Sequence, residues 1–343
     1  MTYDALVLVS FGGPERPEDV APFLANVTRG RGVPPERLAE VAEHYQHFGG
    51  VSPINQQCRD LLAAIRADFA ASGLDLPVYW GNRNWHPMLA DTLAQMRDDG
   101  VRRALAFVTS AYAGYSSCRQ YLDDIALARA AVGPDAPAVD KLRQFWDHPG
   151  FVNPNIDAVR AALGTLDPAQ RSSTRLVFVA HSIPTSMAAT AGPDGGRYEA
   201  QLQETARLVA AAAAPDLPYD LVWQSRSGPP HVPWLEPDIN DHLAALAAEG
   251  VTSVLVSPIG FVSDHLEVVW DLDTEAAGTA KRLGLEYVRA ATPGTDPRFV
   301  TMVRELVLER LKPADSVPRP RLGTLPAWDD CPANCCPAPS RRS

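Results

Sequence analysis

Three carboxylates in the second half of the sequence are spaced for chemistry along one side of a helix. Glu267, Asp271 and Glu275 recur every four residues, which places them on one helical face. Like charges at this spacing destabilise a helix slightly, and no lysine is interleaved with them. Such a row suits the conduction of protons or divalent cations. The alternative for Glu267 is structural, because Asp264 and Glu267 have the spacing of a capping box.

Histidines are the natural companions of these carboxylates. His181 directly follows an apolar run, and His265 lies two residues before Glu267. A neutral imidazole facing a carboxylate can hold ferrous iron or accept a proton near neutral pH. A hydrogen-bonded core histidine is the alternative for His181, and spacing does not give the orientation of His265.

The elements that position these residues are predicted to alternate between strands and helices, which is typical of parallel sheets covered by helices. We predict strands at 6–10, 78–82, 104–110, 138–143, 176–180, 221–224, 253–257 and 285–289. Helical periodicity is found at 53–71, 88–98, 118–131, 198–214, 237–249, 266–283 and 297–311. Because ligands bind beyond the carboxyl ends of the strands in open parallel sheets, the residues that follow each strand are candidate site residues.

The two halves of the chain resemble each other in the same order. LVLVSF at 6–11 matches LVFVAH at 176–181, and VYWGNR at 78–83 matches LVWQSR at 221–226. We therefore expect an α/β protein with two similar Rossmann-like lobes, each a doubly wound parallel sheet, and a cleft between them. The predicted division gives a first lobe at 1–145, a second lobe at 146–295, a return helix at 296–311 and a Pro-rich tail without its own core at 312–343. The alternative is that strands of such sheets simply look alike.

Composition excludes several classes of protein. The chain has 41 Asp and Glu against 31 Lys and Arg, a net charge of -10, whereas binding to nucleic acid or to an anionic membrane needs a basic face. No run approaches the roughly 20 apolar residues of a membrane span, and no export signal is visible, so we expect a cytoplasmic protein without stable membrane insertion. Of five cysteines, Cys331, Cys335 and Cys336 crowd the tail, which is a better pattern for metal ligands than for disulfides.

Six ordered motifs carry a family resemblance over residues 4–311. They are SFGGP at 10–14, TRGR at 28–31, FGGVSP at 48–53, HSIP at 181–184, WQSRSG at 223–228 and GFVSDHLE at 260–267. With these motifs the chain resembles the ferrochelatases, and specifically the coproporphyrin ferrochelatases of Gram-positive bacteria. The resemblance implies a class II chelatase-like fold with a porphyrin cleft between the lobes. It also implies insertion of Fe2+ into coproporphyrin III to give coproheme in heme b biosynthesis.

The resemblance assigns roles to individual residues. It implies that His181 and Glu267 are the metal-site pair, and that Asp271 and Glu275 belong to an acidic row that feeds metal or drains protons. The residues implied to contact the porphyrin are Ser52, Tyr121, Tyr45, Arg29 and Arg31. The two arginines suit propionates because guanidinium pairs well with carboxylate; solvated surface charge is their alternative.

The chemistry of metal insertion asks for these residue types. A divalent ion replaces two pyrrole N–H protons, so the site must distort the macrocycle, deliver the cation and remove the protons. Rigid walls can supply the distortion from binding energy. His181 can take a proton or ligate iron, and Glu267 can balance charge and pass protons along the row.

Two features depart from parts of the family. Phe11 stands where some members have a tyrosine that binds the iron of the product, and a phenylalanine cannot supply that axial ligand. Some members carry a 2Fe-2S cluster on one internal and three C-terminal cysteines, and four thiolates are its usual ligands. By resemblance the set here is Cys118, Cys331, Cys335 and Cys336; zinc or an unliganded tail are the alternatives. Cys58 lies on a helical pattern and is expected to be buried.

The resemblance leaves other functions open. Coproporphyrin is favoured over protoporphyrin IX because no long apolar insertion lies near the cleft loops. A related cobalt chelatase is a further alternative, and a solute-binding protein is the non-enzyme alternative, although such proteins normally carry an export signal. The expected partners are coproporphyrin III and Fe2+, with transient contacts to neighbouring enzymes of heme synthesis and none to nucleic acid.

Overall fold

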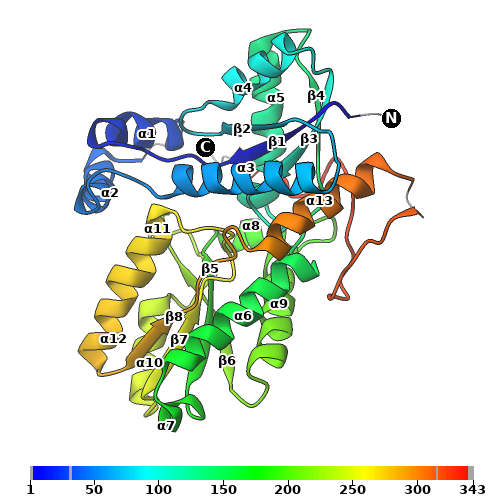
Figure 1. Cartoon of the computed structure of the whole chain (residues 1–343). Coiled ribbons are helices and arrows are strands. Elements are labelled where there is room, and N and C mark those ends of the chain that lie inside the picture. Colours follow the sequence, from blue (N-terminus) through cyan, green and yellow to red (C-terminus); the bar gives the residue numbers. More distant parts are fainter. Residues whose placement is uncertain (1–2, 31–32, 314–315, 339–343) are drawn as a thin grey trace.

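Two four-stranded parallel sheets form the centres of two lobes in a computed structural model, which describes residues 3–30, 33–313 and 316–338 (Figure 1). The first sheet has the order β2-β1-β3-β4 and the second the order β6-β5-β7-β8. The strands are β1 (Ala5–Ser10), β2 (Val78–Asn82), β3 (Arg103–Val108), β4 (Ala138–Lys141), β5 (Arg175–His181), β6 (Tyr219–Gln224), β7 (Ser253–Ser257) and β8 (Glu286–Arg289). The α/β class and the two similar lobes are therefore confirmed. The eight predicted strands are present with ends shifted by at most one residue, except that β6 begins two residues earlier and β3 and β4 end two residues earlier than predicted.

The central strands owe their position to continuous apolar sequence. All six residues of β1 are buried, and so are all five of β7. Strands covered by helices on both faces lose the alternation of apolar and polar residues, which is what these two runs show. Val7 pairs with Tyr79 of β2 on one side and with Ala106 of β3 on the other, so β1 lies inside its sheet. The strands of the second sheet are also parallel, so the carboxyl ends of β5, β6 and β7 meet at one edge of that sheet.

Helices cover both sheets. The first lobe has α1 (Val20–Val27), α2 (Pro35–His47), α3 (Ile54–Ala71), α4 (Leu89–Asp98) and α5 (Gln120–Val132), with short turns η1 (Pro17–Asp19) and η2 (Tyr115–Arg119). The second has α6 (Pro149–Thr165), α7 (Pro168–Arg171), α8 (Thr185–Ala189), α9 (Arg197–Ala213), α10 (Ile239–Ala248) and α12 (Ala277–Leu283). The last helix, α13 (Pro297–Leu311), packs against both α3 and α6. The boundaries proposed at 145 and 295 stay predictions.

The segment predicted as one helix at 266–283 is not a regular α-helix. It begins as α11 (Leu266–Val268), continues as the π-helix η3 (Val269–Ala276) and ends as α12. A π-helix closes its hydrogen bonds one residue further along the chain than an α-helix, and such segments are frequent at functional sites. Glu267 lies in the α-helical part, whereas Asp271 and Glu275 lie in the π-helical part.

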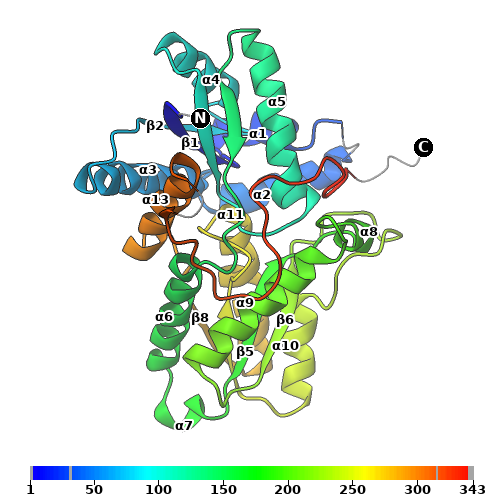
Figure 2. The same ribbon diagram turned by 90° about the vertical axis from the view of Figure 1, so that its right-hand side faces the viewer.

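The tail is docked on the lobes. A Cβ on Gly323 would lie 2.6 Å from the ring of Trp146, and the backbone N–H of Leu322 donates to the carbonyl of Asp147 at 2.8 Å. The Asp147 carboxylate, whose side chain is fully buried, pairs with Arg321 at 2.7 Å. Figure 2 shows this red segment passing near α9 on its way toward α5. Residues 316–338 therefore pack against the lobes, and the prediction that the tail has no core of its own stays a prediction.

The described part of the chain holds no helix that is both long and apolar enough to cross a membrane.

Candidate active site

His181 and Glu267 face each other at the carboxyl edge of the second sheet. His181 is the last residue of β5, and its Nε2 lies 3.6 Å from Oε2 of Glu267 in α11. The Nδ1 of His181 donates to the backbone carbonyl of Ser182 at 2.5 Å. Because a carbonyl only accepts, Nδ1 carries a proton, and Nε2 is the nitrogen that faces the carboxylate and can take a proton or a metal. The side chains keep 34% and 47% of their surface exposed, so a ligand can reach them.

The electrostatics of this pair favour a separated charge. Burial would raise the pKa of Glu267, but the hydrogen bond and charge of His181, with the charge of His265, lower that pKa to about 2. Burial would lower the pKa of His181, but its interactions with Glu267 raise that pKa above the usual value. Glu267 is therefore held as a carboxylate and favours protonation of the imidazole beside it, so a divalent cation would compete with a proton for Nε2.

The capping-box alternative for Glu267 is wrong in this structure. The residue that precedes α11 is His265, and no side chain caps the helix there. Asp264 pairs instead with Arg289 at 3.1 Å. The His265 ring packs edge-on against Phe261 at 5.2 Å between centroids, and burial lowers its pKa. Of the two candidate histidines, it is His181 whose ring nitrogen faces Glu267, with Nε2 3.6 Å from Oε2.

The acidic row continues from this pair along η3. Asp271 accepts a hydrogen bond from Gln224 Nε2 at 3.1 Å and a shorter one from Ser225 Oγ. Burial, opposed by the Ser225 hydrogen bond and reinforced by the charges of Glu267 and Glu275, raises the pKa of Asp271 to about 7. Glu275 is exposed and accepts from Trp270 Nε1 at 2.9 Å. The row thus runs from a half-buried carboxylate that can exchange protons near neutral pH to an exposed one in solvent.

Helix α2 of the first lobe contacts the segment that carries this row. The ring of His44 stacks on Trp270 at 4.0 Å between centroids, and His47 meets the same indole edge-on at 5.5 Å. Beneath this contact, Phe23 and Tyr45 of the first lobe share one hydrophobic cluster with Leu266 of α11. No sequence pattern marks His44 or Trp270, since neither belongs to a strand end or a charged row.

The residues implied to contact a porphyrin gather on the first-lobe side of the same region. Tyr45, Ser52 and Tyr121 are each no more than 6% exposed. Tyr45 packs edge-on against Phe23, which in turn contacts Phe11. A Cβ on Gly13 would lie 2.7 Å from the side chain of Ser52, so the glycine turn after β1 rests directly on this serine.

The two arginines of this set differ in what the structure says of them. Arg29 is exposed after α1 and donates to Asn26 Oδ1 at 2.5 Å. Arg31 lies outside the described residues. The structure adds Arg83, which follows β2; its guanidinium lies 4.5 Å from the centroid of Tyr121 and 5.7 Å from that of Phe11, and its partner is Asp124. Its place directly after a strand was the signal that could have selected it.

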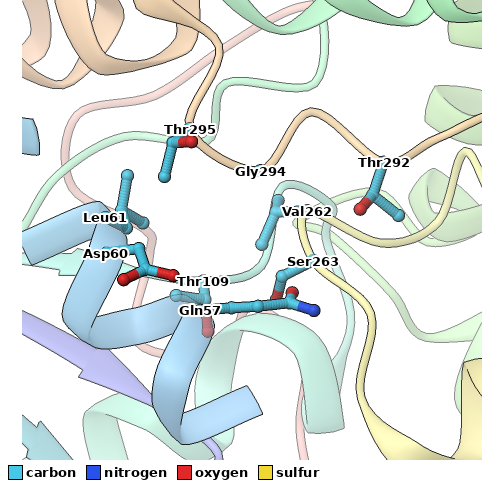
Figure 3. A pocket seen from close by; sticks show the side chains of 9 residues that line it. All are labelled: Gln57, Asp60, Leu61, Thr109, Val262, Ser263, Thr292, Gly294 and Thr295. Carbon is cyan, nitrogen blue, oxygen red and sulfur yellow. The ribbon is translucent and has the colours of Figure 1, made fainter. Parts of the chain in front are cut away.

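A separate cavity of about 230 Å³ opens between the lobes, behind α3 (Figure 3). Gln57 and Asp60 of α3 face Thr109 after β3 and Ser263 after β7 across it. Its lining holds none of the predicted site residues. His181 and Glu267 therefore lie outside this cavity.

The four cysteines implied to hold a cluster come together in two pairs. Cys118 is hydrogen-bonded with Cys331, and this contact lowers the pKa of Cys118 despite its burial. Cys335 Sγ lies 3.5 Å from Cys336 Sγ, which also accepts from the backbone N–H of Gly192 at 3.0 Å. All are free thiols, and no three His, Cys, Asp or Glu side chains among the described residues are arranged to hold one metal ion.

Other groups complete the surroundings of these thiols. Lys141, at the end of β4, is 9% exposed. Burial would lower its pKa, but the negative charge on Cys118 and the neighbouring sulfurs raises it, so a buried cation stands beside the thiols. Such a charge suits an anionic centre. Cys58 lies elsewhere, in the core under α3, and burial raises its pKa to about 11.

Comparison with known proteins agrees with this geometry. The sequence profile of the ferrochelatase family matches residues 3–311. A protein of Nocardia farcinica named coproporphyrin III ferrochelatase is 58% identical, covering 100% of this chain and 98% of the relative. A protein of the same name from Streptomyces griseus is 56% identical, over 98% of this chain and 94% of its own length. Another from Mycolicibacterium smegmatis is 59% identical, over 91% of this chain and 91% of its own length.

Solved structures support the same fold. SirB from Bacillus subtilis with Fe3+ has a TM-score of 0.56 at 12% identity, covering 90% of this chain and 97% of that one. CbiX, described as the terminal enzyme of siroheme biosynthesis in denitrifying bacteria, has a TM-score of 0.50 at 17% identity, covering 90% of this chain and 100% of that one. These likenesses show the two-lobed chelatase fold and nothing finer.

Proposed function

The chain belongs to the ferrochelatase family, and from this premise we propose that it inserts Fe2+ into coproporphyrin III in heme b biosynthesis. The observation that carries the proposal is the His181–Glu267 pair, whose Nε2 and Oε2 lie 3.6 Å apart at the carboxyl edge of the second sheet. The choice of coproporphyrin rests on the names of relatives that match almost the full length of the chain.

The geometry supports a division of labour within the pair. Nε2 of His181 meets the metal or takes a pyrrole proton, since Nδ1 is engaged with Ser182. Glu267 stays ionised near neutral pH and balances the charge of the incoming cation. Asp271 receives protons from the pair, because its pKa of about 7 lets it bind and release them at the working pH. Glu275 passes them to solvent.

The porphyrin, in this proposal, lies between the first-lobe aromatic cluster and the metal pair. Ser52, Tyr45 and Tyr121 are nearly buried in the structure, and Tyr45 shares a hydrophobic cluster with Leu266 of α11, so α2 must move away from α11 to admit the macrocycle. Arg29 and Arg31 then pair with propionates at the rim. Phe11 offers only an apolar ring on its side, so no protein oxygen from this position ligates the iron of the product.

We further propose that Cys118, Cys331, Cys335 and Cys336 hold a 2Fe-2S cluster. The support is their grouping into two pairs of thiols, since such a cluster takes four thiolates divided between two irons, together with the buried cation of Lys141. The cluster would supply a redox-active, charged junction at the end of the docked tail, and it takes no part in metal insertion.

A cytoplasmic location is proposed on the free thiols, because such sets persist in reducing compartments. We propose transient contact with the enzymes that make coproporphyrin and with those that consume coproheme. Both compounds are reactive tetrapyrroles, and such contact would keep them from being released into solution.

The experiment is an anaerobic insertion assay that compares coproporphyrin III with protoporphyrin IX and Fe2+ with Co2+. We expect kcat/KM to be highest for coproporphyrin III with Fe2+. A preference for protoporphyrin IX would replace the substrate, and a preference for Co2+ with sirohydrochlorin would replace the reaction. Tight binding of a solute without any turnover would overturn the proposal as a whole.

A further inference from the structure

Ser225 has a backbone conformation that residues with a side chain rarely adopt. Its φ is +59°, and Cys336 is the other non-glycine residue with positive φ in the part of the chain described. Glycine takes this left-handed conformation without strain, whereas Cβ crowds the backbone. A serine at such a position calls for an explanation by its side chain, because a glycine would satisfy the turn alone.

The hydroxyl of Ser225 supplies that explanation. Ser225 directly follows β6, and its Oγ donates to Oδ2 of Asp271 on the π-helix η3. Gln224, the last residue of β6 and fully buried, donates from Nε2 to the same oxygen at 3.1 Å. Among the described residues no hydrogen bond reaches Oδ1 of Asp271. The end of β6 therefore supplies two hydrogen-bond donors to one oxygen of the Asp271 carboxylate and leaves the other oxygen available.

The loop after Ser225 has its own means of support. Arg226 donates to the carbonyls of Pro230 and Val232, both at 3.1 Å. The turn is thus fixed by contacts that do not involve the Ser225 hydroxyl. What the left-handed backbone adds is the direction of Oγ, which points across to η3.

We propose that Ser225 and Gln224 are positioning residues. They hold the Asp271 carboxylate in place as the group that receives protons from the His181–Glu267 pair. The inference rests on the role proposed above for Asp271. A carboxylate on a π-helical turn has several rotamers, and two donors on one oxygen select a single one. The strained backbone at Ser225 is the cost of aiming the second donor.

The test removes the donor without disturbing the backbone. Ser225→Gly keeps φ near +59° without strain and lacks the hydroxyl, so we expect it to be at least as heat-stable as the wild type. Loss of a hydrogen bond to a charged group should lower kcat for Fe2+ insertion by about tenfold, with KM for coproporphyrin III unchanged. Ser225→Asn tolerates the left-handed backbone and retains a donor, so it should recover most of the lost kcat. Ser227→Gly, which removes an exposed hydroxyl from the same loop, is the matched control and should behave as wild type.

A double-mutant cycle shows whether the effect passes through Asp271. In an Asp271→Asn background, Ser225→Gly should cause no further loss of kcat. The same tenfold loss in both backgrounds, or wild-type kcat in Ser225→Gly, would overturn the positioning role. Wild-type kcat in Asp271→Asn alone would instead show that Asp271 does not accept protons in the reaction, and the inference would fail with that role. If a glycine at 225 impairs folding, Gln224→Met removes the other donor, and a kcat at the wild-type level there would count against the proposal equally.

Discussion

The imidazole of His44 lies parallel to the indole of Trp270, 4.0 Å away between centroids and 12° apart in plane. This contact joins α2 of the first lobe to the π-helix of the second, above the acidic row. Burial lowers the pKa of His44, and this favours the neutral form of the stacked ring. The mouth of the proposed cleft is therefore closed by an aromatic contact between lobes rather than by an ion pair.

Breaking this contact should open the mouth. An aromatic pair contributes about 0.5–1.5 kcal/mol beyond its buried area, so Trp270→Ala should speed association of coproporphyrin III by roughly three- to tenfold. Stopped-flow quenching of porphyrin fluorescence measures the rate. Leu127→Ala, at a side chain 68% exposed on α5, is the control and should not alter it. An unchanged association rate in Trp270→Ala would mean that the porphyrin enters by another route.

Removing the imidazole of His181 should stop insertion while leaving porphyrin binding largely intact. Acid–base or metal-binding groups of this kind contribute on the order of 100-fold or more to kcat, so His181→Ala should lose at least that factor. Anaerobic turnover and porphyrin fluorescence titration separate the two effects. His231→Ala, on an exposed loop, serves as the control. Turnover of His181→Ala within a few fold of wild type would rule out the metal-site role.

Glu267→Gln should lower kcat strongly even when the protein remains folded. The amide keeps the shape of the side chain but lacks the charge that pairs with His181 and with a cation. Some stability should also be lost at neutral pH, because a carboxylate whose pKa is lowered by folding stabilises the native state above its unfolded pKa. Specific activity per folded molecule, from turnover combined with thermal unfolding, decides the matter. A normal specific activity would leave Glu267 a structural residue.

The sequence was sufficient to predict the scaffold and the edge at which His181 and Glu267 meet. Runs such as β1 and β7 are apolar throughout and bounded by turn residues, so their strands and the parallel topology follow from local pattern. Once the strand ends are known, the residues after β5 and β7 must converge. The catalytic roles of His181 and Glu267 stay predictions, because a contact between side chains does not by itself establish a reaction.

Contacts between distant segments carry no such local signal. Nothing in the serine at 225 reports its left-handed backbone, and nothing at Trp270 reports that His44 stacks on it. The π-helical turns of η3 escape detection because residues four apart still recur on nearly the same side. The docking of the tail depends on Gly323 fitting against Trp146, which is a matter of space rather than pattern.

The raised pKa of Asp271 has opposite consequences for activity and for stability. We expect turnover to require the ionised carboxylate of Asp271. The value of kcat should therefore rise with pH through an apparent pKa near 7, and this rise should be absent in Asp271→Asn. A carboxyl whose folded pKa exceeds its unfolded value binds more protons when folded, so it destabilises the native state as pH rises from about 4 to 7. Asp271→Asn should therefore stabilise the fold at pH 8, by about 1–4 kcal/mol, and have little effect at pH 4. Denaturant unfolding at both pH values tests the sign. A variant equally or less stable at pH 8 would mean that the carboxyl has an ordinary pKa.

The cysteine pairs predict a coloured protein. Purified without oxygen, the chain should show the visible absorption of a 2Fe-2S centre with iron and sulfide in equal amounts, and Cys335→Ser should abolish both. Cys58→Ser is the matched control, since the Cys58 side chain on α3 is buried in the core away from the other thiols.

The tail contacts both lobes close to these cysteines. Cys336 accepts a hydrogen bond from the backbone N–H of Gly192 in the second lobe, and Arg119 of the first lobe donates to the carbonyl of Ala333 at 3.0 Å. Loss of the cluster should disturb these contacts and so loosen the tail. Limited proteolysis should then cut Cys335→Ser within 316–338 faster than the wild type. Iron-free wild-type protein, or one zinc ion in place of two irons, would reject the cluster.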